Sequence, residues 1–120
     1  MQPSVASADQ AGIPGSQLPG PYPVGRYVAG LRLKLRSLAR IQLAGEIVNL
    51  RPPTAARVYF DLRDPDGAIP CAMWRTDWDR LGAVTGELAD GARVVVAGGC
   101  DYYPGSATSS PSFSFTVSDL

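Results

Sequence analysis

The sequence predicts a mainly β protein: a five-stranded barrel with an N-terminal helix and a short helix between the third and fourth strands. Apolar residues alternate with polar ones in several short segments, as in strands with one buried face. Gly45 interrupts the first of these segments where an inward side chain is expected, and glycine there permits the sharp bend that closes a small barrel. The length of 120 residues and the apolar content of 45% fit a single domain.

The chain begins with a segment that is expected to stay disordered. Residues 1–21 are rich in proline, glycine, serine and alanine and contain no aromatic side chain, so they cannot offset the entropy lost on ordering. The folded domain then spans residues 22–120. Within it, the apolar positions from Pro23 to Leu38 follow helical spacing, although LRLKLR in isolation also alternates like a strand. We predict a helix here.

The first strand is expected over Arg40 to Leu50, with Ile41, Leu43 and Ile47 directed inward. The next segment, residues 51–56, reads RPPTAA. Two adjacent prolines keep a segment extended and out of a hydrogen-bonded ladder, so we predict an exposed loop.

The segment from Arg57 to Arg75 predicts a hairpin with one apolar and one polar face. Its turn is DPDG, where proline presets φ at the second position and glycine tolerates the closing geometry. Pro70 cannot donate to a ladder and predicts a free edge or a bulge. The inward positions alternate along both strands: Val58, Phe60, Leu62, Ile69, Cys71 and Met73.

The remaining elements complete the barrel. Thr76 to Leu88 has near-helical apolar spacing with Thr76 as its N-cap, and Gly91 to Tyr103 is a strand whose apolar run predicts burial on both faces. Gly98 and Gly99 predict a bulge in that strand. After a flexible loop, Phe113, Phe115 and Val117 alternate in the last strand. This order of elements is that of an OB-fold, whose second and third strands and long loops bind oligonucleotides.

Charge is distributed unevenly along the chain. The formal net charge is zero, but residues 1–75 carry a net charge of +4 and residues 76–120 one of −4. Phosphate binding depends on basic side chains, so the N-terminal part favours a nucleic-acid partner. The alternative is a solvated helix face with scattered surface arginines, which we favour for the helix residues.

The outward positions of the hairpin supply the candidate binding residues. Tyr59 and Trp74 lie on outward registers of adjacent strands, where each could support one base for about 1–3 kcal/mol. Trp74 could instead cover the end of the barrel. Of Tyr102 and Tyr103, alternation allows at most one to reach a ligand. The predicted nucleic-acid-binding residues are Arg51, Arg57, Tyr59, Arg63, Trp74, Arg75 and Tyr103.

Catalysis has little support in this sequence. The chain has no histidine, which excludes Ser/His and Cys/His arrangements. Asp64 and Asp66 are explained as turn residues, and two separated cysteines cannot form a four-ligand zinc site. We expect no catalytic residue, no metal and no cofactor, with Cys71 and Cys100 reduced in the core. No apolar run or leader pattern indicates a membrane or secretion, so we expect a cytoplasmic protein.

The sequence resembles the N-terminal OB-fold domain of the exodeoxyribonuclease VII large subunit, over roughly residues 22–120. Four blocks carry the resemblance: GEIVNL from Gly45, VYFDLRD from Val58, IPCAMWR from Ile69 and DGARVVVAGGCDYYPG from Asp90. Anticodon-binding domains of class II aminoacyl-tRNA synthetases share a similar order of strand, glycine and strand. The family often has Gly-His before the Tyr-Phe pair; here Ala56 and Arg57 stand there, and arginine retains phosphate contact and stacking.

The resemblance implies a module that holds single-stranded DNA for exonucleolytic cleavage. In the family, a catalytic domain and long helices that bind small subunits follow the OB-fold, and we expect neither function from these 120 residues. The sequence leaves open two alternatives: a barrel face that docks a protein or a second copy, and a barrel that binds tRNA like those of the synthetases.

Overall fold

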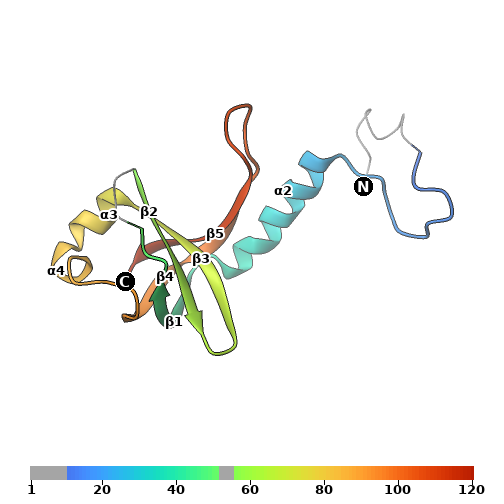
Figure 1. Ribbon diagram of the computed structural model, residues 1–120. Helices are drawn as coiled ribbons and strands as arrows, with labels where there is room; N and C mark the ends of the chain where they lie inside the picture. The colour runs from blue at the N-terminus through green and yellow to red at the C-terminus, as the bar shows by residue number, and fades with distance from the viewer. Residues whose placement is uncertain (1–10, 52–55) are drawn as a thin grey trace.

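The computed structural model describes residues 11–51 and 56–120, and it confirms the predicted closed barrel (Figure 1). Around the barrel the strands follow the order β1-β2-β3-β5-β4 and return to β1. The strands are β1 (Ile41–Val48), β2 (Arg57–Asp64), β3 (Gly67–Trp74), β4 (Arg93–Tyr103) and β5 (Ser112–Asp119). All pairings are antiparallel except that of β3 with β5.

Gly45 closes the barrel as predicted. From Ile41 to Glu46, β1 pairs with β4, and from Glu46 to Val48 it pairs with β2. The strand changes partners beside Gly45, which is buried. A β-carbon on Gly45 would lie 2.8 Å from the carbonyl oxygen of Arg63, so only glycine permits this close approach.

The alternation of β2 and β5 produces the core. Val58, Phe60, Phe115 and Val117 are at most 1% exposed and pack with Ile47 from β1. Because these inward residues come from strands on different sides of the closed sheet, they fill the barrel interior.

Three predictions about single strands have different outcomes. The ladder between β3 and β5 runs from Cys71 to Met73 and leaves Pro70 outside it, which confirms the free edge. The bulge is also confirmed, since the register of β4 shifts between Ala97 and Gly98. Burial of β4 on both faces is wrong, since Val95 is 52% exposed.

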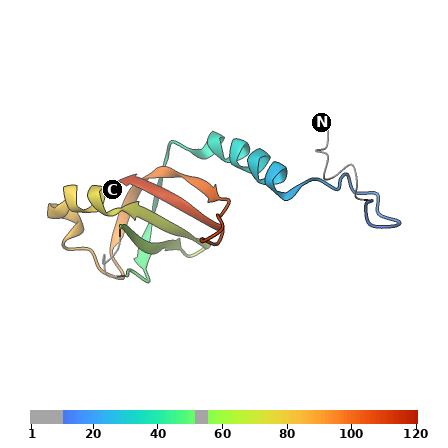
Figure 2. The same cartoon turned by 90° about the horizontal axis from the view of Figure 1, so that it is seen from above.

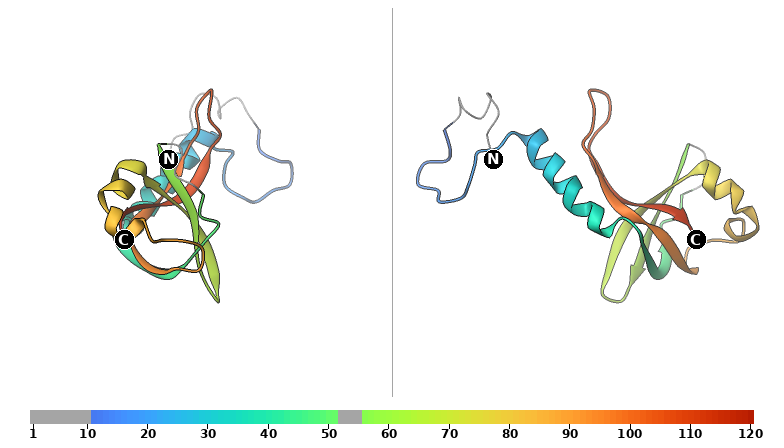
Figure 3. Two further views of the ribbon diagram at one scale, coloured as in Figure 1. Left: turned by 60° about the vertical axis from the view of Figure 1, so that its left-hand side comes forward. Right: turned by 180° about the vertical axis from the view of Figure 1, so that it is seen from behind.

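The predicted N-terminal helix is present as α2 (Val24–Leu35), followed by the 3₁₀ turn η1 (Arg36–Leu38). None of its residues is buried, and it extends away from the barrel (Figure 2). The loop between β4 and β5 leaves the barrel on the side of α2 (Figure 3). Of the predicted tail, residues 1–10 lie outside the described part of the chain, and residues 11–21 form neither helix nor strand.

The segment between β3 and β4 contains two short helices, α3 (Arg75–Arg80) and α4 (Gly82–Thr85). The prediction that Thr76 is the N-cap is wrong. The helix begins one residue earlier and follows Trp74 without a side-chain cap. Leu81 leaves helical geometry with φ −94° and ψ 24°, which divides the segment in two. Among the described residues, no helix has the length and apolar character needed to cross a membrane.

Candidate nucleic-acid interface

Two aromatic rings and two guanidinium groups alternate at one end of the β2–β3 hairpin. The Arg57 guanidinium carbon lies 4.9 Å from the centre of the Trp74 ring and 5.9 Å from that of Tyr59. The Arg51 guanidinium carbon lies 6.0 Å from the Tyr59 ring. We call Arg51, Tyr59, Arg57 and Trp74 the arginine–aromatic cluster. Each contact is within the range of cation–π attraction.

The hairpin register places the members of the cluster next to one another. Pro65 and Asp66 form a two-residue turn, and this turn sets the pairing that brings Arg57 opposite Trp74. The Asp64 carboxylate fixes the turn by accepting hydrogen bonds from the amides of Asp66 and Gly67 at 2.9 and 3.0 Å. Asp64 therefore acts as a turn residue, as the sequence predicts.

Backbone hydrogen bonds hold both ends of the loop before β2 against the hairpin. The Arg51 amide donates to the Tyr59 carbonyl at 3.1 Å, and the Arg75 amide donates to the Ala56 carbonyl at 2.8 Å. The rest of the predicted 51–56 loop, residues 52–55, lies outside the described residues. Arg51 thus joins the cluster from the loop, and Tyr59 joins it from the strand.

The rings of the cluster are open to solvent. Tyr59 is 41% exposed and Trp74 is 50% exposed, so both side chains are partly accessible from solvent. The Nε donor of Arg57 is buried and makes no hydrogen bond to the described part of the protein.

The other predicted site residues lie apart from the cluster. Arg63 is exposed on the same face of β2, but it is four residues from Tyr59, which at about 3.3 Å per residue is roughly 13 Å along the strand. Arg75 is not on the strand as predicted: it begins α3 and forms an ion pair with Asp79 at 3.6 Å. Tyr103 lies at the end of β4, which pairs with β1 and β5 rather than with the hairpin.

Asn49 positions a side chain of the hairpin surface, although it was not among the residues predicted from the sequence. Its φ of 55° ends β1 in a left-handed conformation, and its side-chain amide donates to the Asp61 carboxylate at 2.9 Å. Asp61 is the one acidic side chain between Tyr59 and Arg63 on the outward positions of β2. The hydrogen bond draws this carboxylate toward β1. An asparagine directly after a strand is the local signal that predicts such a conformation.

The cysteines lack the properties of nucleophiles. Burial, with a smaller contribution from Asp61, raises the pKa of the Cys71 thiol to about 12, and burial also raises the pKa of Cys100. Both are free thiols, as predicted. Across the described ranges, no three His, Cys, Asp or Glu side chains gather as metal ligands.

Comparison with known proteins gives relatives among the large subunits of exodeoxyribonuclease 7. The exodeoxyribonuclease 7 large subunit of Moorella thermoacetica is 36% identical over 67 residues, which are 56% of this chain and 16% of the relative. That of Enterobacter sp. strain 638 is 33% identical over 89 residues, which are 73% of this chain and 19% of the relative. The chain thus spans less than a fifth of the length of these relatives. The resemblance in the sequence is confirmed.

A family model matches nearly the whole folded part of the chain. It covers residues 22–120 and describes an OB-fold nucleic acid binding domain. These bounds contain the α2 helix, all five strands and the arginine–aromatic cluster. The chain therefore belongs to the family of OB-fold nucleic acid binding domains.

Proposed function

We propose that this domain binds single-stranded DNA across the β2–β3 hairpin, without strong sequence preference. The observation that carries the proposal is the alternation of rings and guanidinium groups in Arg51, Tyr59, Arg57 and Trp74. Unpaired bases stack on exposed rings, and arginines contact the phosphates between them. Every base has a flat face, so stacking of this kind discriminates little between sequences.

The names of the relatives support DNA as the ligand. They are large subunits of an exodeoxyribonuclease, and this chain matches less than a fifth of their length. In the proposed setting, the domain holds a single strand so that a catalytic region outside these residues cleaves it. The same setting includes small nuclease subunits that bind elsewhere on the large subunit.

The proposal is tested by removing one ring from the cluster. Tyr59→Ala is expected to weaken binding of fluorescein-labelled oligo-dT by about 5- to 150-fold, because one stacked base contributes about 1–3 kcal/mol. Fluorescence anisotropy measures the affinity. Tyr59→Phe retains the ring and should bind nearly as wild type does.

A matched control removes an exposed apolar side chain far from the cluster. Val95→Ala lies on the outside of β4 and should leave the affinity unchanged. Wild-type affinity in a folded Tyr59→Ala protein would refute the proposed surface. Titration with an RNA oligonucleotide of the same sequence checks the DNA preference, and equal affinity for both would favour the tRNA-type barrel.

A further inference from the structure

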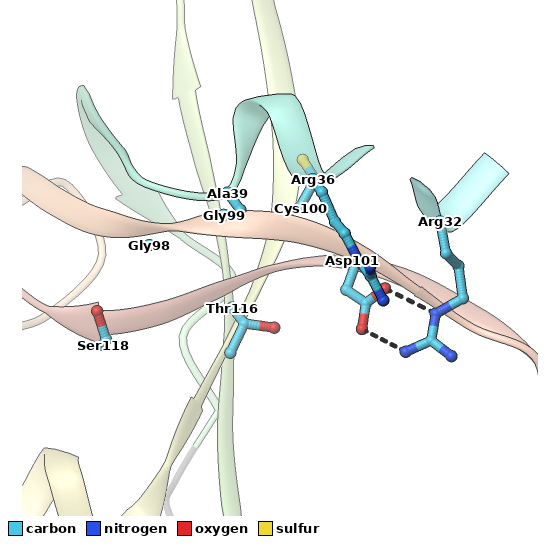
Figure 4. A pocket seen from close by; sticks show the side chains of 9 residues that line it. All are labelled: Arg32, Arg36, Ala39, Gly98, Gly99, Cys100, Asp101, Thr116 and Ser118. Carbon is cyan, nitrogen blue, oxygen red and sulfur yellow. Dashed lines mark hydrogen bonds and ion pairs between the residues drawn. The ribbon is translucent and has the colours of Figure 1, made fainter. Parts of the chain in front are cut away.

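A cleft separates α2 and η1 from the outer face of β4 and β5. Its volume is about 400 Å³, and a second hollow of about 650 Å³ adjoins it and shares Ala39, Gly98 and Ser118 with it. Arg32 and Arg36 line the first hollow from the helical side (Figure 4). Arg40 lines the second hollow. On the barrel side the cleft is lined mainly by backbone and small side chains, whereas its helical side carries the arginines.

Two contacts fix the helical wall against the barrel. Arg32 donates two hydrogen bonds to the Asp101 carboxylate, both at 3.0 Å, in a bidentate ion pair. Gly99 lies directly against the backbone of Ala39, where any β-carbon would overlap it. The arrangement of α2 beside β4 therefore depends on a charge pair and on a glycine.

The cleft keeps a positive charge after this pairing. The hydrogen bond from Arg32 holds the pKa of Asp101 below its ordinary value, and the charge of Arg36 lowers it further, so Asp101 stays ionised and offsets one arginine. Arg36 is directed toward the same carboxylate (Figure 4). Neither Arg36 nor Arg40 forms an ion pair with any residue that the structure describes. The sequence has no acidic residue from position 10 to position 45.

Strand pairing connects the cleft with the arginine–aromatic cluster. Tyr59 pairs with Ala72, Ala72 pairs with Thr116, and Thr116 pairs with Gly99. Thr116 and Gly99 line the cleft. Neighbouring strands are about 4.8 Å apart. Two strand spacings, roughly 10 Å in total, therefore separate Tyr59 from Thr116 at the edge of the cleft. Ala72, which lies between them, is only 1% exposed, so a strand that reaches both regions passes over the side chains that cover it.

We propose that this cleft is a second phosphate site for the same DNA strand that stacks on the cluster. Arg36 and Arg40 contact two backbone phosphates, and the Thr116 hydroxyl lies beside the path between the two sites. This inference rests on the proposed function, since it extends the footprint of the strand from the hairpin across β5 to α2. Only oligonucleotides long enough to reach both regions engage the cleft.

Removal of two charges from the cleft tests the inference. Arg36→Gln with Arg40→Gln should weaken binding of an oligo-dT of about 15 nucleotides on the order of tenfold at about 0.1 M salt, because two phosphate contacts are lost. The slope of log affinity against log salt should become shallower by about 1.4, at about 0.7 per contact on a single strand. An oligo-dT of about 5 nucleotides, near the lower end of OB-fold site sizes, should bind both proteins equally.

The matched control removes two charges from α2 at positions outside the cleft. Arg26 and Lys34 line an apolar hollow beside Tyr22 and Tyr27 rather than the cleft, so Arg26→Gln with Lys34→Gln should leave the salt slope unchanged. An equal loss in this control would overturn the cleft as a site, and so would wild-type binding of the long oligonucleotide by the Arg36/Arg40 variant. Arg36→Lys with Arg40→Lys keeps both charges and should restore the slope. Failure of the unaltered protein to bind either oligonucleotide would instead refute the proposed function.

Discussion

Trp74 and Trp78 are the two tryptophans of the chain, and they lie in opposite environments. Trp74 ends β3 and is 50% exposed with Arg57 against its ring, whereas Trp78 is 7% exposed and packs into the core from α3. From alternation along the strand alone, Trp74 could either stack on a ligand or cover the end of the barrel. The structure places its ring in the arginine–aromatic cluster, and Trp78 contributes to the core beside it.

This difference makes Trp74 a direct probe of stacking. Addition of oligo-dT should quench the part of the tryptophan emission that comes from Trp74, because a base stacked on the exposed indole perturbs its excited state. A steady-state fluorescence titration measures the effect. In Trp74→Phe only the buried Trp78 emits, and its signal should not respond to DNA. Equal quenching in wild type and Trp74→Phe would place the DNA away from Trp74.

Among the elements, β1 depends most on a single residue. Gly45→Ala should lower the free energy of unfolding by about 1–3 kcal/mol, because the new β-carbon would lie 2.8 Å from the Arg63 carbonyl oxygen and 3.0 Å from the Leu62 side chain. The same substitution in α2, Gly30→Ala, meets no atom within 4 Å and should stabilise by up to about 1 kcal/mol. Urea denaturation of both variants measures the two changes. Equal effects of the same sign would show that β1 does not need glycine for its bend.

The strands could be predicted because their burial follows a local pattern. Val58, Phe60 and Leu62 enter the core as their period of two requires, and the two-residue turn after Asp64 then sets the register that brings Arg57 to Trp74. A reader of the sequence could thus derive the central pair of the cluster.

Features that depend on packing between distant segments could not be derived in the same way. The start of α3 at Arg75 is set by the end of β3 and its bond to Ala56, and it overrides the capping preference of Thr76. The exposure of Val95 depends on what the rest of the chain packs against β4, which its own apolar run does not encode. The cleft beside α2 requires Arg32 to meet Asp101, and 69 positions separate these two residues.

At the scale of the whole molecule, unbalanced positive charge gathers at one end. Basic residues from Arg26 to Arg40 lie along α2 and its junction with β1, whereas Asp77 and Asp79 in α3 form ion pairs with the arginines of the same helix. Figure 1 shows these helices on opposite sides of the barrel. A formal net charge of zero therefore conceals a local excess of positive charge along α2. Since salt screens exposed charges beyond about 10 Å at 0.1 M, a strand near α2 is little affected by acidic side chains on the far side of the barrel.

Salt dependence therefore distinguishes a nucleic-acid surface from a protein-docking face on this neutral chain. Binding of oligo-dT should weaken linearly on a log–log scale as NaCl rises from about 0.05 to about 0.2 M, with a slope of about −0.7 for each phosphate neutralised. Contacts by Arg51 and Arg57 alone give a slope of about −1.4, and the two further contacts proposed in the cleft would bring it to about −2.8.

Anisotropy gives the slope, and sedimentation velocity in the same buffers reports self-association. A packed apolar interface responds little to salt, because it releases no condensed counterions. Salt-independent self-association without DNA binding would identify the barrel face as a docking surface. A steep slope from a chain of zero net charge would instead show that local arginines, rather than the overall charge, determine its affinity for DNA.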